Sequence, residues 1–147
     1  MSNMKENNYF ELVHIHELPS VFNREIPINA EMLKGCSLAY LVVFQYKEGS
    51  ESVGLHVSIR YMTPDNKVLM QEGATLVAVL DGWKEMAREE NELRADIRFR
   101  SLVDYGLAFV SGMVFRRTSG TVMNSIFVPH MAVGNIINEV RIEEVKK

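Results

Sequence analysis

The chain has 147 residues, of which 47% are hydrophobic and 24% are charged, and its formal net charge at neutral pH is −3. This length and composition predict a single folded domain over residues 1–147 with a sizeable core, and they exclude a disordered or fibrous chain. The slightly acidic balance argues against a nucleic-acid-binding module, which usually carries a basic stripe.

Cysteine usage and the apolar segments exclude further classes of protein. Cys36 is the single cysteine, so an internal disulfide and a cysteine-based zinc site are excluded. The opening residues MSNMKENNYFELVHIHELP lack the apolar core of a secretory signal. The most apolar stretch, residues 101–115, is shorter than the roughly 20 residues that a membrane-spanning helix needs. We therefore expect a cytoplasmic protein that does not insert into a membrane.

Residues 10–80 predict a sheet, after a loose polar lead over residues 1–8. Four segments alternate between apolar and polar residues or run apolar throughout, as strands do. They are YFELVHIHEL from residue 9, SLAYLVVFQY from residue 37, VGLHVSIRYM from residue 53 and VLMQEGATLVAVL from residue 68. The turn-forming sequences KEGSES and TPDNK separate the last three segments. Pro19 and Pro27 make the stretch after the first segment an edge strand or a loop, and Gly73 is expected to bend the fourth strand.

The hydrophobic period changes after this sheet, and helical spacing continues without proline over residues 81–120. Asp81 is expected to cap this helical region and Gly120 to end it, as one helix or as two with a break near residues 94–97. In the closing residues 125–147, Pro129 predicts the first turn of a short amphipathic helix. The expected fold class is therefore α+β, a four-stranded antiparallel sheet followed by a long helix and a short C-terminal helix, with the helices on one side of the sheet.

The second half of the helical region is apolar on both sides. One side carries residues spaced to cover a sheet, namely Phe99, Leu102, Val103, Gly106, Phe109, Val110 and Met113. The reverse side is mostly small, with an apolar group near each end, and holds Ile97, Ser101, Asp104, Ala108, Ser111 and Phe115. Because a helix that is apolar all round is buried on both sides, we expect a second copy of the chain to cover the reverse side. The expected oligomer seam consists of Ile97, Asp104, Ala108, Ser111 and Phe115. The alternative cover is the segment 84–96 or the C-terminal segment folding back.

The sequence contains no catalytic or metal-binding arrangement with a recognisable spacing. His14 and His16 share one face of a strand, but no third ligand has a suitable spacing. His56 and His130 have no nucleophile nearby in the sequence, and the glycines of GLAFVSG lie inside a helix, unlike those of a phosphate-binding loop. The arginines that flank the apolar helix are expected to cap and solubilise its ends, and they are Arg94, Arg98, Arg100, Arg116 and Arg117. We therefore expect no enzyme activity, cofactor or metal.

Two stretches of the sequence resemble the SecB family of protein-export chaperones. RSLVDYGLAFVSGMVFRRTSGTVMNSIFVPHMAVGNII, from Arg100 to Ile137, is similar to the family's long helix, the turn after it and the proline-containing start of its last helix. EGATLVAVL is similar to the family's fourth strand. The resemblance implies a homotetramer, a dimer of dimers whose long helices pack across the central interface. It also implies an ATP-independent holdase that binds unfolded polypeptides along apolar grooves between sheet and helix.

The sequence departs from the family pattern at two places. The closing RIEEVKK differs from the family's tail of small and acidic residues, which has a role in docking the translocation ATPase. Glu72 is the nearest candidate for the acidic sheet surface that the family uses for the same docking. The chain therefore resembles a divergent member, and chaperones dedicated to a toxin–antitoxin pair are one such group.

Client binding would be driven by burial of apolar surface, at about 25 cal/mol per Å² before entropy is subtracted. The expected groove residues are Tyr40, Val42, Phe44 and Tyr61 on the strands, with Trp83 and Met86 on a segment that could lid the groove. Two alternatives remain open: a domain whose sheet and helix enclose an apolar small molecule, and an oligomeric adaptor that binds no client. The small, semi-apolar reverse side of residues 97–115 counts against the first alternative, which predicts a polar back face.

Overall fold

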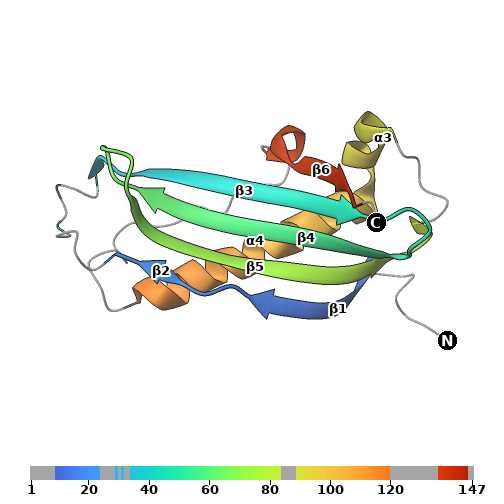
Figure 1. Ribbon diagram of the computed structural model, residues 1–147, viewed down its shortest axis with the longest axis horizontal. Coiled ribbons are helices and arrows are strands. Elements are labelled where there is room, and N and C mark those ends of the chain that lie inside the picture. The colour runs from blue at the N-terminus through green and yellow to red at the C-terminus, as the bar shows by residue number, and fades with distance from the viewer. Residues whose placement is uncertain are drawn as a thin grey trace.

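The computed structural model describes residues 9–23, 29, 31, 34–83, 89–119 and 136–145, and it has two layers (Figure 1). One layer is a curved sheet of six strands, and the other is the long helix α4 (Ile97–Thr118), which crosses one face of the sheet obliquely. The short helix α3 (Glu90–Ala95) precedes α4. The strands are β1 (Phe10–Glu17), β2 (Val21–Phe22), β3 (Ser37–Tyr46), β4 (Ser52–Met62), β5 (Val68–Leu80) and β6 (Arg141–Glu144).

The strands are arranged in the order β1-β5-β4-β3-β6, and β2 also pairs with β5. All neighbouring strands are antiparallel except β3 and β6, which are parallel. The four strands predicted from the sequence are confirmed. The prediction of a four-stranded antiparallel sheet is nevertheless wrong in number and direction, because β2 and β6 extend the described sheet to six strands and β6 makes it mixed.

Gly73 lies within β5 and was expected to bend this strand. The pairing of β5 with β4 instead continues in register on both sides of the residue, from Ala74 opposite Val57 to Glu72 opposite Ile59. The glycine allows β5 to lie close to Val57 of β4 and to Leu18. A Cβ atom at this position would be 3.0 Å from the carbonyl oxygen of Val57 and 3.3 Å from the side chain of Leu18. Gly73 therefore serves the packing of the sheet, and it interrupts no pairing.

The inner face of α4 packs directly against the middle of β4 and β5. Gly106 lies at the point of closest approach, since a Cβ atom there would be 2.7 Å from a methyl group of Leu55 and 3.0 Å from one of Val57. The predicted inner side of the helix is confirmed. Its residues Phe99, Leu102, Val103, Gly106, Val110 and Met113 are buried and Phe109 is half-buried.

The helical region contains two helices, which meet at Asp96. The Asp96 carboxylate accepts a hydrogen bond from the backbone N–H of Arg98 at 2.8 Å, as an N-cap of α4 does, and forms an ion pair with the Arg98 guanidinium at 2.7 Å. These hydrogen bonds to Arg98 hold the pKa of Asp96 below its usual value. The predicted cap at Asp81 is wrong, because Asp81 lies in a turn before Gly82, whose φ is +70°. The expected stop at Gly120 lies outside the described residues.

The described end of the chain is the strand β6, and most of the segment expected to form the short C-terminal helix lies outside the described residues. Ile136 is helical, and after it the chain forms a 3-10 turn, Ile137–Glu139, followed by β6. The Arg94 guanidinium binds the backbone of this turn. It donates hydrogen bonds at 2.7 Å to the carbonyl oxygens of Ile137 and Val140, which an α-helix would use for its own backbone bonds. Pro129 lies outside the described residues.

Candidate functional site

The reverse face of α4 points away from the sheet and stays open in the single chain. This face consists of Ile97, Ser101, Asp104, Ala108, Ser111 and Phe115, which include the five predicted seam residues. Ile97 and Phe115 are 54% and 61% exposed, and Ala108 is also exposed. Ser101, Asp104 and Ser111 are half-buried. Ile97, Ala108 and Phe115 on this face are thus exposed in the single chain.

The exposed side of α4 continues into the edge strand β1. The ring of Phe10 packs edge-to-face on the ring of Tyr105, with their centroids 5.6 Å apart. Near the other end of β1, the Glu17 carboxylate forms an ion pair with the Arg116 guanidinium at 3.3 Å. Val13 is 60% exposed at a register shift between these two contacts. β1 and α4 thus form one continuous surface with scattered apolar side chains.

Four of the predicted groove residues, Tyr40, Val42, Phe44 and Tyr61, lie on the face of the sheet that α4 covers, and Trp83 follows β5 and packs against Phe44. Four of the predicted residues are buried in the hydrophobic core, Tyr40 is half-buried, and Met86 lies outside the described residues; the buried four are Val42, Phe44, Tyr61 and Trp83. The Phe44 ring centroid is 4.8 Å from that of Phe99 on α4 and 5.6 Å from that of Trp83. The sheet therefore holds these side chains next to one another, and in this structure Tyr40 is the most accessible of the described five.

Two of these residues carry a buried polar group without a hydrogen-bond partner. The hydroxyl groups of Tyr40 and Tyr61 are both inaccessible to solvent and form no hydrogen bond. Burial, together with the neighbouring Tyr40, raises the pKa of Tyr61 to about 12, and burial raises the pKa of Tyr40 as well. Both phenols therefore remain protonated hydrogen-bond donors at neutral pH. An unsatisfied buried hydroxyl costs free energy, which an arriving acceptor would recover.

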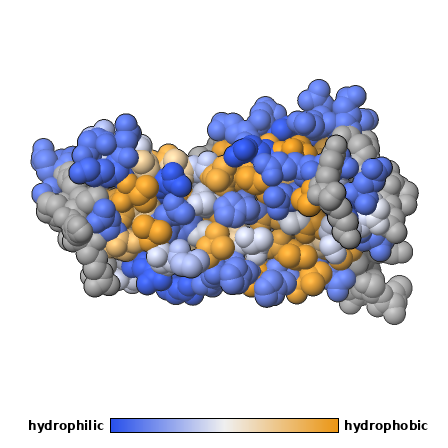
Figure 2. Space-filling model, viewed as in Figure 1, coloured by the Kyte–Doolittle hydropathy of each residue, from blue (hydrophilic) through white to orange (hydrophobic). Residues whose placement is uncertain are grey.

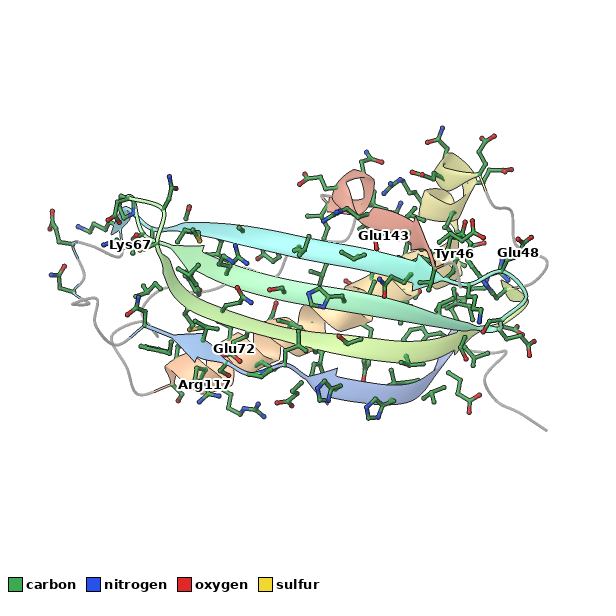
Figure 3. All side chains as sticks on the ribbon, in the orientation of Figure 1. Tyr46, Glu48, Lys67, Glu72, Arg117 and Glu143 are labelled. Atoms are coloured by element: carbon green, nitrogen blue, oxygen red, sulfur yellow. The ribbon has the colours of Figure 1, made fainter. Side chains whose placement is uncertain are left out.

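The two sides of β3 are paired to different extents. One side pairs with β4 along the whole of β3, from Ser37 opposite Met62 to Tyr46 opposite Val53. The other side pairs with β6 over four residues only, from Val43 opposite Arg141 to Tyr46 opposite Glu144. Figure 3 shows Tyr46 and Glu143 on these two neighbouring strands. Among the described residues, no strand lies beside residues 37–42 on this second side.

A buried charge cluster joins the far end of α4 to the sheet (Figure 3). The Glu72 carboxylate is 2% exposed; it accepts a hydrogen bond from the Ser20 hydroxyl at 2.8 Å and forms an ion pair with the Arg117 guanidinium at 3.3 Å. Arg117 also donates a hydrogen bond to the Ser20 hydroxyl at 2.7 Å. The suggestion that Glu72 supplies an acidic docking surface is wrong, because its carboxylate is buried and paired. Sequence reasoning missed this cluster because its members are far apart along the chain.

The outer face of the sheet carries His14, His16 and His56, and the described residues there form no metal-binding arrangement. The rings of His14 and His16 are stacked with centroids 6.3 Å apart, and Thr75 of β5 separates His16 from His56. In the described part of the chain, no group of three metal-binding side chains comes together. Figure 2 shows this face as apolar patches interrupted by hydrophilic side chains. Cys36 is half-buried, and burial raises the pKa of its thiol, which keeps it protonated and unreactive.

Comparison with known proteins gives a likeness in fold and no match in sequence. No family model matches the sequence, and no curated protein matches it either. The fold is similar to that of the Mycobacterium tuberculosis SecB-like chaperone Rv1957, solved in complex with a ChAD peptide from the antitoxin HigA1 (Rv1956). The identity is 10% and the TM-score is 0.47, over 87% of this chain and 88% of that chain. No helix in the described part of this chain is long and apolar enough to cross a membrane.

Proposed function

We propose that this protein is an ATP-independent holdase-type chaperone that self-associates through α4 and binds unfolded polypeptides in an apolar groove along the sheet. The observation that carries the proposal is the open reverse face of α4, with Ile97 and Phe115 more than half exposed at its two ends. Large apolar side chains exposed at both ends of one helix face are buried when another helix packs along that face. The proposed function needs neither a bound cofactor nor a catalysed reaction.

The reverse face of α4 suits pairing with the same face of a second copy. Its residues are spaced alternately by four and three positions from 97 to 115, and this spacing reads the same in both directions. In an antiparallel pair of helices, Ile97 of one copy therefore meets Phe115 of the other, Ser101 meets Ser111, and Asp104 meets Ala108. Large residues at the ends and small ones in the middle allow two helices to approach closely. Two such pairs give the dimer of dimers that the sequence resemblance implies.

The client groove in this proposal is formed by Tyr40, Val42, Phe44, Tyr61, Trp83 and Met86. Tyr40 is accessible from outside, while the four buried members become available only when their cover moves, so a client contacts Tyr40 first. The unpartnered hydroxyls of Tyr40 and Tyr61 can donate hydrogen bonds to backbone carbonyl groups, which every unfolded chain carries. Because these hydrogen bonds are made to the client backbone, clients of many different sequences can form them. The chaperone serves either protein export or a toxin–antitoxin pair, and the identity of its clients decides between these two roles.

The same two hydroxyls favour one competing function, the binding of an apolar small molecule with a polar end. Such a ligand would also satisfy both phenols inside an apolar enclosure. The open reverse face of α4 counts against this alternative, because a ligand enclosed by the sheet and the inner face of the helix leaves Ile97 and Phe115 uncovered.

The proposed function is tested by two measurements on the purified protein. We expect light scattering to give four times the 16.8 kDa mass of one chain. We also expect one protein chain per client chain to suppress aggregation of a chemically unfolded client without ATP. Tyr40→Phe removes a single hydroxyl and should weaken the suppression, whereas Tyr9→Phe, at an exposed tyrosine, should leave it unchanged. A monomer that suppresses no aggregation contradicts the proposal, and a monomer that carries a co-purified apolar ligand supports the alternative.

A further inference from the structure

The edge of β3 at residues 37–42, which pairs with no other described strand, lacks the features that normally protect an edge strand. Folded proteins guard such edges with charged residues, prolines or bulges, since an open edge recruits other extended chains. Residues 37–42 read SLAYLV, without a charge or a proline, and they pair with β4 without a shift in register. β1 at the opposite edge of the sheet is protected by Glu11, Glu17 and a register shift between Leu12 and His14. The two edges of this sheet therefore differ in their readiness to accept a further strand.

β6 shows what kind of segment the edge of β3 accepts. It is an extended segment whose apolar residue Ile142 lies in register with Phe44 and packs against the core. The other residues of this strand are charged and largely solvated: Arg141 and Glu144 are exposed, and Arg141 pairs with Glu143 at a nitrogen–oxygen distance of 3.7 Å. The pairing thus uses backbone hydrogen bonds and one half-buried apolar side chain, which many sequences can supply.

β6 is held weakly, whereas the residues before it are held firmly. β6 has four residues and pairs in parallel, the less stable of the two pairing modes, and its ion pair is exposed and contributes little. Ile137 and Val140 are buried, and Arg94 donates hydrogen bonds to both of their carbonyl oxygens. The strand can therefore leave β3 while the chain stays attached at Val140.

We propose that the edge of β3 binds an extended polypeptide as an added strand, and that β6 is an intramolecular competitor occupying one end of this edge. This inference rests on the proposed function and names the chemistry of its client site. A client strand hydrogen-bonds to the backbone of residues 37–46 and places alternate apolar side chains on the inner face, beside Tyr40 and Phe44. The partly exposed ring of Tyr40 and its unpartnered hydroxyl lie within the stretch that β6 leaves open.

A reversible cross-link between β6 and β3 tests this proposal within one molecule. Gln45 and Glu143 are opposite each other in the parallel pair, and their side chains are 3.3 Å apart and exposed. Neighbouring strands lie about 4.8 Å apart, which suits a disulfide. The double variant Gln45→Cys/Glu143→Cys in a Cys36→Ser background therefore locks β6 in place when oxidised. The probe is fluorescently labelled, reduced and carboxymethylated α-lactalbumin, which cannot refold.

We expect the oxidised variant to bind this probe about tenfold more weakly than the same variant after reduction, a change of about 1.4 kcal/mol. Ile142→Lys removes the half-buried apolar side chain that β6 packs against the core, and the variant should bind the probe several-fold more tightly than the unaltered protein. Val13→Lys makes the same charge change on the opposite edge strand and should bind like the unaltered protein. Equal binding by the oxidised and reduced forms overturns the inference but leaves the proposed function intact. Absence of probe binding by every form, the unaltered protein included, overturns both.

Discussion

The two faces of α4 contain one glycine each, and the two glycines lie in opposite surroundings. Gly106 faces the sheet, where a Cβ atom would come within 2.7 Å of Leu55 and 3.0 Å of Val57. Gly112 faces outward, where a Cβ atom would meet nothing within 4 Å. A glycine in a helix costs about 1 kcal/mol relative to alanine. At Gly106 the close packing against the sheet offsets this cost. At Gly112 nothing within the described chain offsets it, and the packing of a partner helix would do so.

The inner face of α4 stabilises the single chain, whereas the reverse face remains available for association with another chain. The inner face is filled by contacts that the chain makes with itself, and its large residues Phe99, Leu102 and Val110 are fully buried. On the reverse face, by contrast, Ala108 and the two end residues Ile97 and Phe115 are exposed. Changes on the inner face should therefore alter the free energy of unfolding. Changes on the reverse face should alter the assembly of chains and leave each chain folded.

The largest expected effect on stability is at Gly106. Gly106→Val should lower the free energy of unfolding by about 3 kcal/mol, because its side chain would overlap Leu55 and Val57 in a filled core. Urea unfolding followed by circular dichroism measures the loss, and Gly112→Val is the matched control on the opposite face. If both variants lose the same free energy, the two faces do not differ in the way described.

The smallest expected effect is at Gly112 and has the opposite sign. Gly112→Ala should raise the free energy of unfolding of the single chain by about 0.5–1 kcal/mol, since the added methyl group meets no atom and improves helix propensity. The measurement belongs in an Ala108→Glu background, in which we expect the chains to be separate. A clear loss of stability in that background would show that the outer side of α4 is covered within one chain.

Alternation and helical spacing were enough to predict much of this fold from the sequence. β4 was predicted because its residues alternate, and β3 because it is rich in aliphatic and aromatic residues and ends at a turn-forming sequence. The inner face of α4 was predicted because Leu102, Gly106, Val110 and Met113 repeat at helical spacing. The seam residues also lie on one face, as the same spacing requires. Such patterns depend only on residues that lie close together in the sequence, so they could be recognised without the structure.

The features that sequence reasoning missed depend on distant residues. The strand β6 was not predicted, and it depends on the edge of β3 with which it pairs and on Arg94, which binds the backbone of the turn before it. The ion pair of Glu72 with Arg117 joins residues that no local pattern connects. The sequence also could not show that α4 lies over Phe44 rather than beside it, because burial of a strand face depends on what packs against it.

The central claim is that a second copy of the chain covers the reverse face of α4, and the molecular mass in solution tests it most directly. The unaltered protein should have several times the mass of one chain, 16.8 kDa. Ala108→Glu places a charge at the centre of the seam and should reduce the mass to that of smaller assemblies or single chains, with an unchanged circular dichroism spectrum. An unaltered protein with the mass of one chain, or an Ala108→Glu variant that keeps the full mass, would contradict the claim.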